Sequence, residues 1–333
     1  MGLKGLQLIP SFQDNSINMK LPQLPRFLRE LHLGWCDLGD GDIPYDISGL
    51  FNLQVLYLCG NNFSRLDSSL SRIPCLKLLN LSSCTKLVEL PDLPSSIAIL
   101  QAKECDSLQS VGDLSAYKCL WKVSLQRRDK LIGGERLLHS MLQVNALEDR
   151  FMSVQLPPGS FGKSAFETST FSDTRRLITL QLPHNWYNDF SGFLFFTDNT
   201  QWSMESCSIV IRQEMSMNSQ PDHDQWEAFD KNKESYEHSQ VGYVPFSSLR
   251  CTPCWNSASY TNVTFEIDED MANPKIGLVP RRSATGDCSE CWDEGNCFGK
   301  TFEIKDDPNS SNVQIVWNHG FVAALLTEIF SDD

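Results

Sequence analysis

Leucine recurs along the first 130 residues at fixed spacings rather than in the alternation of an ordinary strand. In LKLLNLSSC, which begins at residue 76, Leu76, Leu79 and Leu81 take positions one, four and six, and Cys84 takes position nine. The same pattern starts at residues 28, 53 and 97 and, more weakly, at 120. These starting positions lie 25, 23, 21 and 23 residues apart. So short and regular a period predicts an array of repeated units rather than one globular core.

The pattern L-x-x-L-x-L-x-x-N/C-x-L, at a period of about 20 to 29 residues, is that of leucine-rich repeats. One repeat is too small to bury its own apolar row, so neighbouring repeats stack and share a continuous core. Position nine holds Cys36, Asn61, Cys84 and Cys105, whose side chains can point inward and bond the backbone of the turn. Arg128 stands there in the fifth copy, which predicts that the solenoid ends near residue 131.

The pattern changes after the repeats. Leu137, Met141 and Val144 lie at helical spacing, which predicts a capping helix within residues 132–150. Short β-rich runs then begin at residues 177, 190, 206, 241, 260, 275 and 313, separated by turns. The predicted fold class is therefore an α/β leucine-rich-repeat solenoid over 1–131, then a mostly antiparallel β-sandwich of jelly-roll or Ig-like type over 151–306 and a C-terminal strand and tail over 307–333.

Two long polar loops interrupt these β-rich runs, one from residue 215 to 240 and one from 281 to 300. Each is longer than a simple connection requires, and long loops on a rigid scaffold often carry binding surfaces. The formal net charge of −14, from 28 Lys and Arg against 42 Asp and Glu, argues against nucleic acid as a partner. No window reaches the roughly 18 uninterrupted apolar residues of a membrane span, so we expect a cytoplasmic or nuclear protein.

Candidate chemistry is sparse. GSFGKS at 159–164 and GNCFGKT at 295–301 lack the first glycine of a phosphate-binding loop, and no serine stands in a G-x-S-x-G motif, so we expect no cofactor and no enzymatic activity. Two Cys-x-x-Cys pairs, with Cys297 nearby, leave open a zinc site or disulfides, and a zinc-dependent enzyme stays a third hypothesis. These pairs are Cys251 with Cys254 and Cys288 with Cys291.

The strand positions that face away from the leucines predict a partner-binding surface on the concave face of the solenoid. Trp35 and Tyr57 fall on adjacent strands beside aliphatic residues, and exposed aromatic residues beside aliphatic ones are enriched at protein interfaces. The candidate partner-binding residues are Glu30, His32, Trp35, Val55, Tyr57, Leu78, Asn80, Ile99, Gln101, Lys103 and Glu104.

Residues 29–111 resemble the repeat region of plant TIR-type nucleotide-binding disease-resistance receptors, in particular through LPDLPSSI at 90 and AKECDSL at 102. Further on, LQLPHNWYNDFSGF at 180, VGYVPFSSL at 241 and KIGLVPR at 275 resemble the β-sandwich that follows the repeats in that family, known as the C-JID. The family's P-G-x-x-I-P-x-W motif survives here only as Pro158-Gly159. The resemblance covers roughly residues 1–305.

The resemblance implies a non-enzymatic recognition module of an intracellular immune receptor, which senses pathogen effector proteins in the defense response. The implied partner is an effector or a guarded host protein and, in a full-length receptor, its own nucleotide-binding domain. An alternative is a cell-surface or secreted leucine-rich-repeat protein that binds a peptide or a glycan. A signal peptide upstream would favour that alternative, whereas a nucleotide-binding domain upstream would favour the receptor.

Overall fold

The structure is a computed structural model. It describes residues 5–7, 24–43, 45–109, 111, 114, 116–126, 134–158, 160, 177–182, 186–200, 208–213, 238–249, 262–266, 275–281, 303–306 and 312–316. For a minority of these residues, including those of the second sheet described below, the backbone alone is described.

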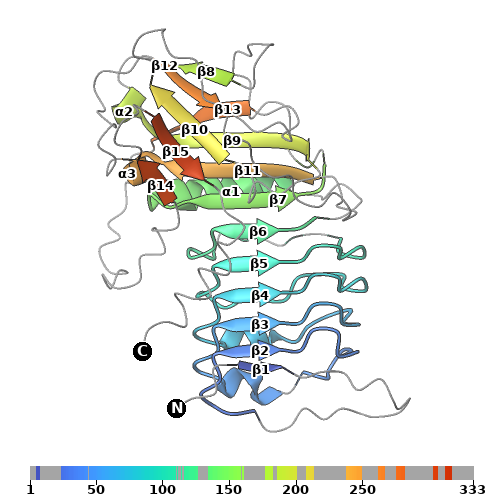
Figure 1. Cartoon of the computed structure of the whole chain (residues 1–333). Coiled ribbons are helices and arrows are strands. Elements are labelled where there is room, and N and C mark those ends of the chain that lie inside the picture. Colours follow the sequence, from blue (N-terminus) through green and yellow to red (C-terminus); the bar gives the residue numbers. More distant parts are fainter. Residues whose placement is uncertain are drawn as a thin grey trace.

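Six short parallel strands stack along the first part of the chain and form a solenoid (Figure 1). The register aligns position four of every repeat, so Leu31 pairs with Leu56, Leu56 with Leu79, and Leu79 with Leu100. The predicted repeat register is therefore present in the structure. The six strands are β1 (Gly5–Gln7), β2 (Glu30–His32), β3 (Val55–Tyr57), β4 (Leu78–Asn80), β5 (Ile99–Gln101) and β6 (Lys122–Ser124).

Strand β1 adds one repeat before those identified from the leucine pattern. Leu6 pairs in parallel with Leu31, 25 residues further along the chain. Leu3, Leu6 and Leu8 are indeed spaced as positions one, four and six, but the ninth residue is Ser11 rather than Asn or Cys. The missing position-nine residue explains why the sequence pattern did not reveal this copy.

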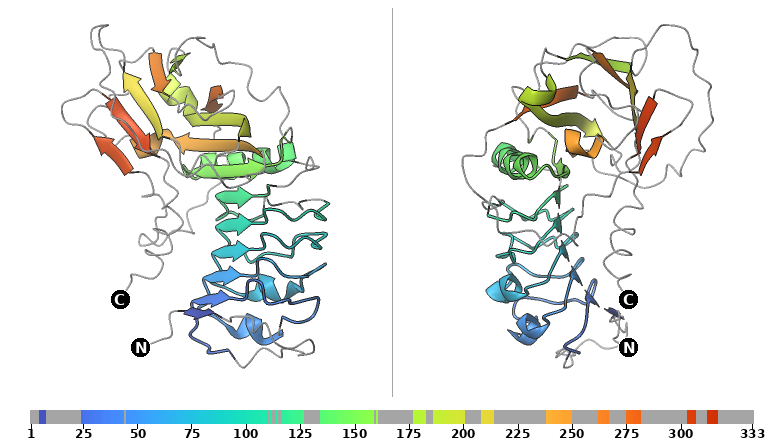
Figure 2. Two further views of the ribbon diagram at one scale, coloured as in Figure 1. Left: turned by 45° about the vertical axis from the view of Figure 1, so that its right-hand side comes forward. Right: turned by 90° about the vertical axis from the view of Figure 1, so that its left-hand side faces the viewer.

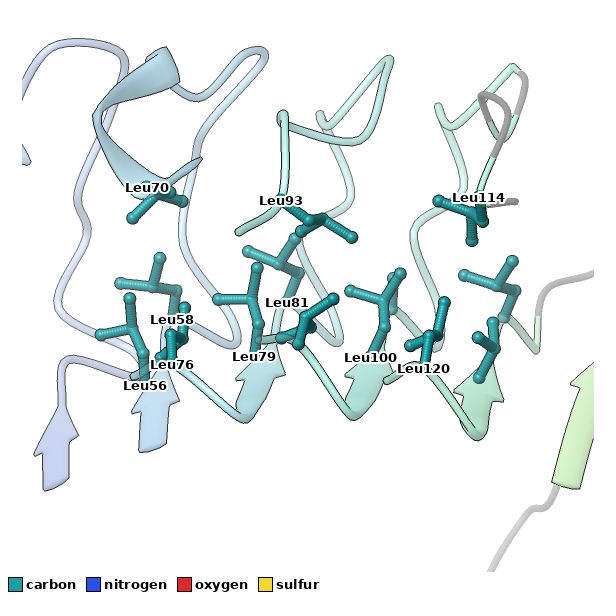
Figure 3. Close-up of a cluster of buried hydrophobic side chains, with 14 of the residues drawn as sticks. Leu56, Leu58, Leu70, Leu76, Leu79, Leu81, Leu93, Leu100, Leu114 and Leu120 are labelled. Atoms are coloured by element: carbon teal, nitrogen blue, oxygen red, sulfur yellow. The ribbon is translucent and has the colours of Figure 1, made fainter. Parts of the chain in front are cut away.

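The leucines of successive repeats form one continuous core between the strands and the connections behind them (Figure 3). Leu56, Leu79 and Leu100 are completely buried. Leu70, Leu93 and Leu114, which come from the connections, close the core on its other side. Two of these connections contain short 3-10 helices, η1 (Tyr45–Gly49) and η2 (Ser68–Arg72), on the convex side of the solenoid (Figure 2).

Position nine joins adjacent repeats through hydrogen bonds, as predicted. The Asn61 Oδ1 accepts from the backbone N–H groups of Cys36 and Leu38, both at 3.1 Å. The Asn61 Nδ2 donates to the carbonyl oxygens of Leu33 and Leu58, both at 2.8 Å. At the same position, the thiol of Cys84 donates to the Leu58 carbonyl oxygen at 3.3 Å and the thiol of Cys105 to the Leu81 carbonyl oxygen at 3.2 Å.

The solenoid sheet does not stop at β6. Strand β7 (Met152–Leu156) pairs in parallel with β6 and antiparallel with β11 (His238–Pro245). Strands β9 (Phe190–Thr200) and β13 (Lys275–Pro280) then extend the same sheet in antiparallel fashion. The sequence predicts an end near residue 131, and the structure places one further parallel strand beyond it. One ten-stranded sheet therefore runs from the first repeat into the C-terminal part of the chain.

Helix α1 (Gly134–Leu147) lies where the capping helix was predicted and connects β6 with β7. Its residues Leu137, Leu138 and Met141 are buried in the same core as the repeat leucines. Asn145, near its end, donates to the Leu120 carbonyl oxygen at 3.0 Å and so ties the helix to the last repeat. The helix therefore shares the apolar interior of the solenoid.

A second sheet of five antiparallel strands lies in the C-terminal part (Figure 1). All seven β-rich runs predicted after residue 151 are strands, whereas β7 and β14 were not predicted. Their assembly into a jelly-roll or Ig-like β-sandwich stays a prediction. The five strands are β8 (Leu177–Gln181), β10 (Ser208–Gln213), β12 (Asn262–Glu266), β14 (Glu303–Asp306) and β15 (Asn312–Val316).

Two four-residue helices flank the antiparallel strands of the first sheet, α2 (Trp186–Asp189) and α3 (Phe246–Leu249). Trp186 and Phe193 both meet Phe246 edge to face, with ring centroids 5.0 and 4.9 Å apart. Edge-to-face contacts of buried aromatic rings add stabilisation beyond the burial of their area. These rings anchor both helices on the sheet that continues the solenoid.

Candidate functional site

A recurring turn follows strands β2 to β5 and fixes where the residue at position eight points. Trp35, Gly60, Ser83 and Glu104 occupy this position, with φ angles of 58°, 67°, 60° and 58°. Left-handed backbone is uncommon for residues other than glycine, so surrounding interactions must hold it in place. The backbone N–H of each of the four donates to a carbonyl oxygen of the next repeat, for example Trp35 to Cys59 at 2.8 Å and Gly60 to Ser82 at 2.8 Å.

Three aromatic side chains gather where this turn leaves β2 and β3. We call His32, Trp35 and Tyr57 the aromatic edge. The rings of His32 and Tyr57 stack, with centroids 4.4 Å apart and planes inclined by 18°, and the Glu30 carboxylate contacts the His32 Nε2. Burial, followed by the nearby Glu30 and Cys59, raises the pKa of the Tyr57 hydroxyl. The edge is thus an ordered arrangement rather than three independent surface residues.

Trp35 is the most exposed member of the aromatic edge, with 64% of its surface accessible, yet the structure makes room for its ring. A Cβ atom at Gly60 would lie 2.3 to 2.5 Å from three atoms of the Trp35 ring. The ring therefore rests directly on the Gly60 backbone of the neighbouring repeat. An indole held on a rigid backbone loses little conformational entropy when a partner binds it.

The predicted concave-face residues divide into two groups in the structure. Glu30, His32, Trp35, Tyr57, Asn80, Gln101, Lys103 and Glu104 are exposed or half-buried. Val55, Leu78 and Ile99 are buried, with exposed fractions of 0%, 1% and 1%. A partner cannot touch these three aliphatic side chains in the conformation that the structure shows.

The buried group belongs to an apolar cluster that is separate from the leucine core. We call this cluster, which consists of Val55, Leu78, Ala98, Ile99 and Trp121, the strand-face cluster. Tyr57 and Phe151 pack against its two ends. Sequence analysis missed Trp121 because it stands at position two of the fifth copy, outside the positions assigned to the concave face, and it missed Phe151 because that residue follows the repeats.

Polar side chains continue this face beyond β6. The Ser124 hydroxyl donates to the Gln155 Oε1 at 2.8 Å, and the Gln155 Nε2 donates to the Gln240 Oε1 at 3.5 Å. All three residues are completely buried, and they come from β6, β7 and β11. The chain of hydrogen bonds therefore crosses the junction between the parallel and antiparallel parts of the sheet. Separations of 31 and 85 residues hide this arrangement from any local sequence pattern.

The polar members of the predicted surface interact with one another in the fourth and fifth repeat units of the structure. The Asn80 Oδ1 accepts from the backbone N–H of Ser82 at 2.9 Å. The Ser82 Oγ accepts from the backbone N–H of Lys103 at 3.3 Å, and the Ser83 hydroxyl donates to the Glu104 carboxylate at 3.0 Å. These bonds order the polar end of the surface, opposite its aromatic end.

The predicted cysteine site and most of the two polar loops, residues 215–237 and 282–300, lie outside the described residues, whereas residues 238–240 of the first loop belong to β11. Within the part of the chain that the structure describes, no group of three or more His, Cys, Asp or Glu side chains is arranged to hold a metal ion. Burial raises the pKa of the Cys36, Cys84 and Cys105 thiols, that of Cys105 to about 12. A high pKa disfavours the nucleophilic thiolate, so these three cysteines serve the repeat framework. No described helix is both long and apolar enough to cross a membrane.

No protein-family model matches the chain. Among curated proteins, TMV resistance protein N of Nicotiana glutinosa is 40% identical over 184 residues, which are 50% of this chain and 15% of that protein. Disease resistance-like protein DSC1 of Arabidopsis thaliana is 29% identical over 177 residues, 48% of this chain and 14% of that protein. Disease resistance protein RML1B, also of Arabidopsis thaliana, is 37% identical over 60 residues.

The segments matched in proteins N and DSC1 thus make up about a seventh of each relative's length. All three relatives are plant disease resistance proteins of the TIR-NBS-LRR type. Over about half of its length, this chain is homologous to plant disease resistance proteins of that type.

Proposed function

We propose that this chain is a non-enzymatic recognition module of a plant intracellular immune receptor. In this role it binds a pathogen effector, or a host protein that an effector targets, in the cytoplasm or the nucleus. In a full-length receptor it also contacts the receptor's own nucleotide-binding domain. The homology to three disease resistance proteins supports the receptor role, and the aromatic edge supports a protein as the ligand.

The observation that carries the proposal is the exposed Trp35 on its glycine support. Tryptophan and tyrosine are enriched among the residues that dominate binding energy at protein interfaces. Trp35, which follows β2, is 64% exposed. His32 of β2 and Tyr57 of β3 form a stacked pair. The half-buried or exposed polar residues from Asn80 to Glu104 then supply a rim that can donate and accept hydrogen bonds.

The test is a comparison of Trp35→Ala with Phe51→Ala. Phe51 is similarly exposed, at 61%, but it follows η1 on the convex side. Removing an interface aromatic residue typically costs at least about 2 kcal/mol, or roughly thirtyfold in affinity. We expect Trp35→Ala to lose that much affinity for the partner, whereas Phe51→Ala binds as the unchanged chain does. The partner is isolated by pull-down from infected plant extract and titrated by calorimetry.

Equal affinity of the two variants would show that the aromatic edge is not the binding site. Tyr57 stays unchanged in this test because it also packs on the strand-face cluster. Replacing Tyr57 would therefore alter folding and binding together. A partner that is a peptide or a glycan rather than a folded protein would favour the alternative of a cell-surface protein.

A further inference from the structure

The Trp35 indole has one supported face and one open face. A Cβ atom at Gly60 would lie 2.3, 2.4 and 2.5 Å from the ring atoms Cδ2, Cε3 and Cε2. Nearly equal distances to three adjacent ring atoms mean that Gly60 lies against the face of the ring rather than its edge. The opposite face is open to solvent, because 64% of the Trp35 surface is accessible. Among aromatic side chains, tryptophan offers the ring face that attracts a cation most strongly.

Carboxylates precede and follow Trp35 in the repeat that contains β2. Glu30 begins β2, and Asp37 and Asp40 come after the turn. The Asn62 Nδ2 donates to the Asp37 carboxylate, so this carboxylate reaches across to the next repeat as the indole does. Asp37 and Asp40 are both exposed. An open ring face among exposed carboxylates favours a positively charged group.

The Glu30 carboxylate retains an oxygen that can bind a partner. Its Oε1 contacts the His32 Nε2, and its side chain is 21% exposed. Among the described residues, none donates a hydrogen bond to its Oε2. Burial and, after it, the charge of Glu30 raise the pKa of the Tyr57 hydroxyl, so the carboxylate lies near that hydroxyl. A cationic donor bound here would therefore meet a carboxylate oxygen beside the stacked rings.

The positive charges of this repeat lie at its other end. Arg26 and Arg29 precede β2, and neither forms an ion pair with these carboxylates. Residues 24–29 include no Asp or Glu, and residues 30–43 include no Lys or Arg. The charge thus changes sign along the repeat, and the aromatic edge lies in the negative part.

We propose that the aromatic edge recognises a basic segment of the partner protein, which places an Arg or Lys side chain on the open face of Trp35. This inference rests on the proposed function, because it names the chemistry of the partner at the same site. Further cations of the segment pair with Glu30 and Asp37, which also accelerate its approach. An acidic segment is repelled, so the edge selects its partner by charge as well as by shape.

The cation site is tested first without any partner protein. A single fluorotryptophan replaces Trp35 in the full chain, and fluorine NMR follows its signal during titration with N-acetylargininamide. The neutral analogue N-acetylcitrullinamide has nearly the same shape and serves as the second probe. The matched control carries the fluorotryptophan in place of Phe27, which is 75% exposed but stands next to Arg26.

We expect a saturable shift at position 35 with the arginine probe and an affinity at least about tenfold lower for the citrulline probe. Position 27 should show no saturable shift with either probe. No saturable shift at position 35, or equal affinities for the two probes, would overturn the proposal. Because no partner is present, this result does not depend on the proposed function.

The second test uses the partner protein isolated by the pull-down described above. Trp35 is replaced by tryptophan with one, two or three ring fluorines, which keep the shape of the side chain but withdraw electron density from its face. A cation on that face should lose affinity with each fluorine, by about tenfold in total. Constant or rising affinity would show an apolar contact and refute the basic partner, while leaving the proposed function intact. Full affinity of Trp35→Ala, in contrast, would refute the proposed function itself.

The carboxylates are tested by Glu30→Gln, which keeps an acceptor for His32 but removes the charge. We expect it to lower the affinity for the isolated partner by about threefold to tenfold at low salt, and the difference to shrink as salt is added. Glu89→Gln is the matched control, because the Glu89 carboxylate is already paired with Arg65 at 3.3 Å. Equal affinities of the Glu30→Gln and Glu89→Gln chains at low salt would contradict recognition of a basic segment.

Discussion

Asn61 differs from the cysteines at the same repeat position in how many hydrogen bonds it makes. Its amide makes four bonds to backbone groups, whereas the structure gives the Cys84 thiol one bond, to the Leu58 carbonyl oxygen. The amide also has an acceptor, which serves the N–H groups of Cys36 and Leu38. A thiol is a poor acceptor, so cysteine at this position replaces the hydrogen-bond donor of asparagine but not its acceptor.

Replacing Asn61 should therefore destabilise the solenoid in a graded way. Asn61→Ala leaves several buried backbone groups unpaired, each at about 1 to 3 kcal/mol, so we expect a total loss of at least about 3 kcal/mol. Asn61→Cys keeps one donor and should lose clearly less. Urea denaturation of both variants measures the difference, and equal losses would show that the amide hydrogen bonds do not determine stability here.

Asp40 offers a pH-dependent contact between repeats. Its carboxylate accepts from the Ser64 hydroxyl, from the Ser64 N–H at 2.7 Å and from the Arg65 N–H at 3.1 Å. These bonds, that of the Ser64 hydroxyl foremost, lower the pKa of Asp40. Since the folded pKa lies below the unfolded one, the stabilisation is present above the ordinary aspartate pKa of about 4 and is lost as pH falls through the lowered value.

We expect Asp40→Asn to lower the melting temperature at pH 7 and the difference from the unchanged chain to shrink below about pH 4. Thermal unfolding followed at several pH values provides the measurement. Asp67→Asn is the control, because the exposed Asp67 carboxylate makes no capping hydrogen bond to η2. A difference that stays constant down to pH 2 would argue against a role for the Asp40 carboxylate.

At the scale of the repeat element, the left-handed turn at position eight determines the shape of the exposed surface. Four different residues occupy it, Trp35, Gly60, Ser83 and Glu104, and only glycine adopts such a conformation without strain. Hydrogen bonds to the next repeat hold the other three in place. The sequence could not predict this turn, because the four side chains share no chemical property. It did predict the inward leucines and the inward Asn or Cys at position nine, because residues of the same kind recur there from copy to copy.

Gly60→Ala should disturb this turn in two ways. The φ of +67° is costly for alanine, by roughly 1 to 2 kcal/mol, and the new Cβ would collide with the Trp35 ring. We expect a loss of at least about 2 kcal/mol for Gly60→Ala alone and a smaller loss when Trp35→Ala is already present. A double-mutant cycle in urea measures this coupling. Strictly additive losses would show that the indole does not rest on Gly60.

At the scale of the whole molecule, the continuous sheet makes the repeats and the C-terminal part mechanically dependent on each other. Strand β7 pairs with β6 on one side and with β11 on the other. The repeat leucines and side chains of β9, β11 and β13 belong to one core. A disturbance in the repeats should therefore be transmitted across β7 into the antiparallel strands.

Leu79→Asp should unfold the solenoid cooperatively, because it places an unpaired charge at a completely buried position. Circular dichroism should show a lower melting temperature, and hydrogen exchange should show loss of protection in β11 as well as in β4. Thr85→Asp, at an exposed position of the same repeat, should leave both measurements unchanged. An unchanged transition in Leu79→Asp would contradict the assigned register, and protection retained in β11 would contradict the mechanical coupling.

The sequence predicted local features of the fold better than the pairings between distant segments. Short-range patterns of apolar residues specify the register of the repeats, the helix within 132–150 and seven later strands. The sequence could therefore predict these features. The pairing of Val123 with Val154, and the hydrogen bonds among Ser124, Gln155 and Gln240, depend on segments up to 116 residues apart. The burial of Val55, Leu78 and Ile99 likewise depends on what covers them, which no property of their own strands reveals.

The parallel junction between β6 and β7 has a consequence for how such chains can diverge. Every strand from β1 to β7 pairs with its neighbour in the same direction, so a whole repeat gained or lost between β3 and β6 would leave both the junction and the aromatic edge intact. Each such event would move the aromatic edge by about 4.8 Å relative to the C-terminal strands without turning it to another side. Duplication and deletion of repeats could thus adjust the separation of two contact regions to partners of different sizes, while point substitutions alter the chemistry of each region independently.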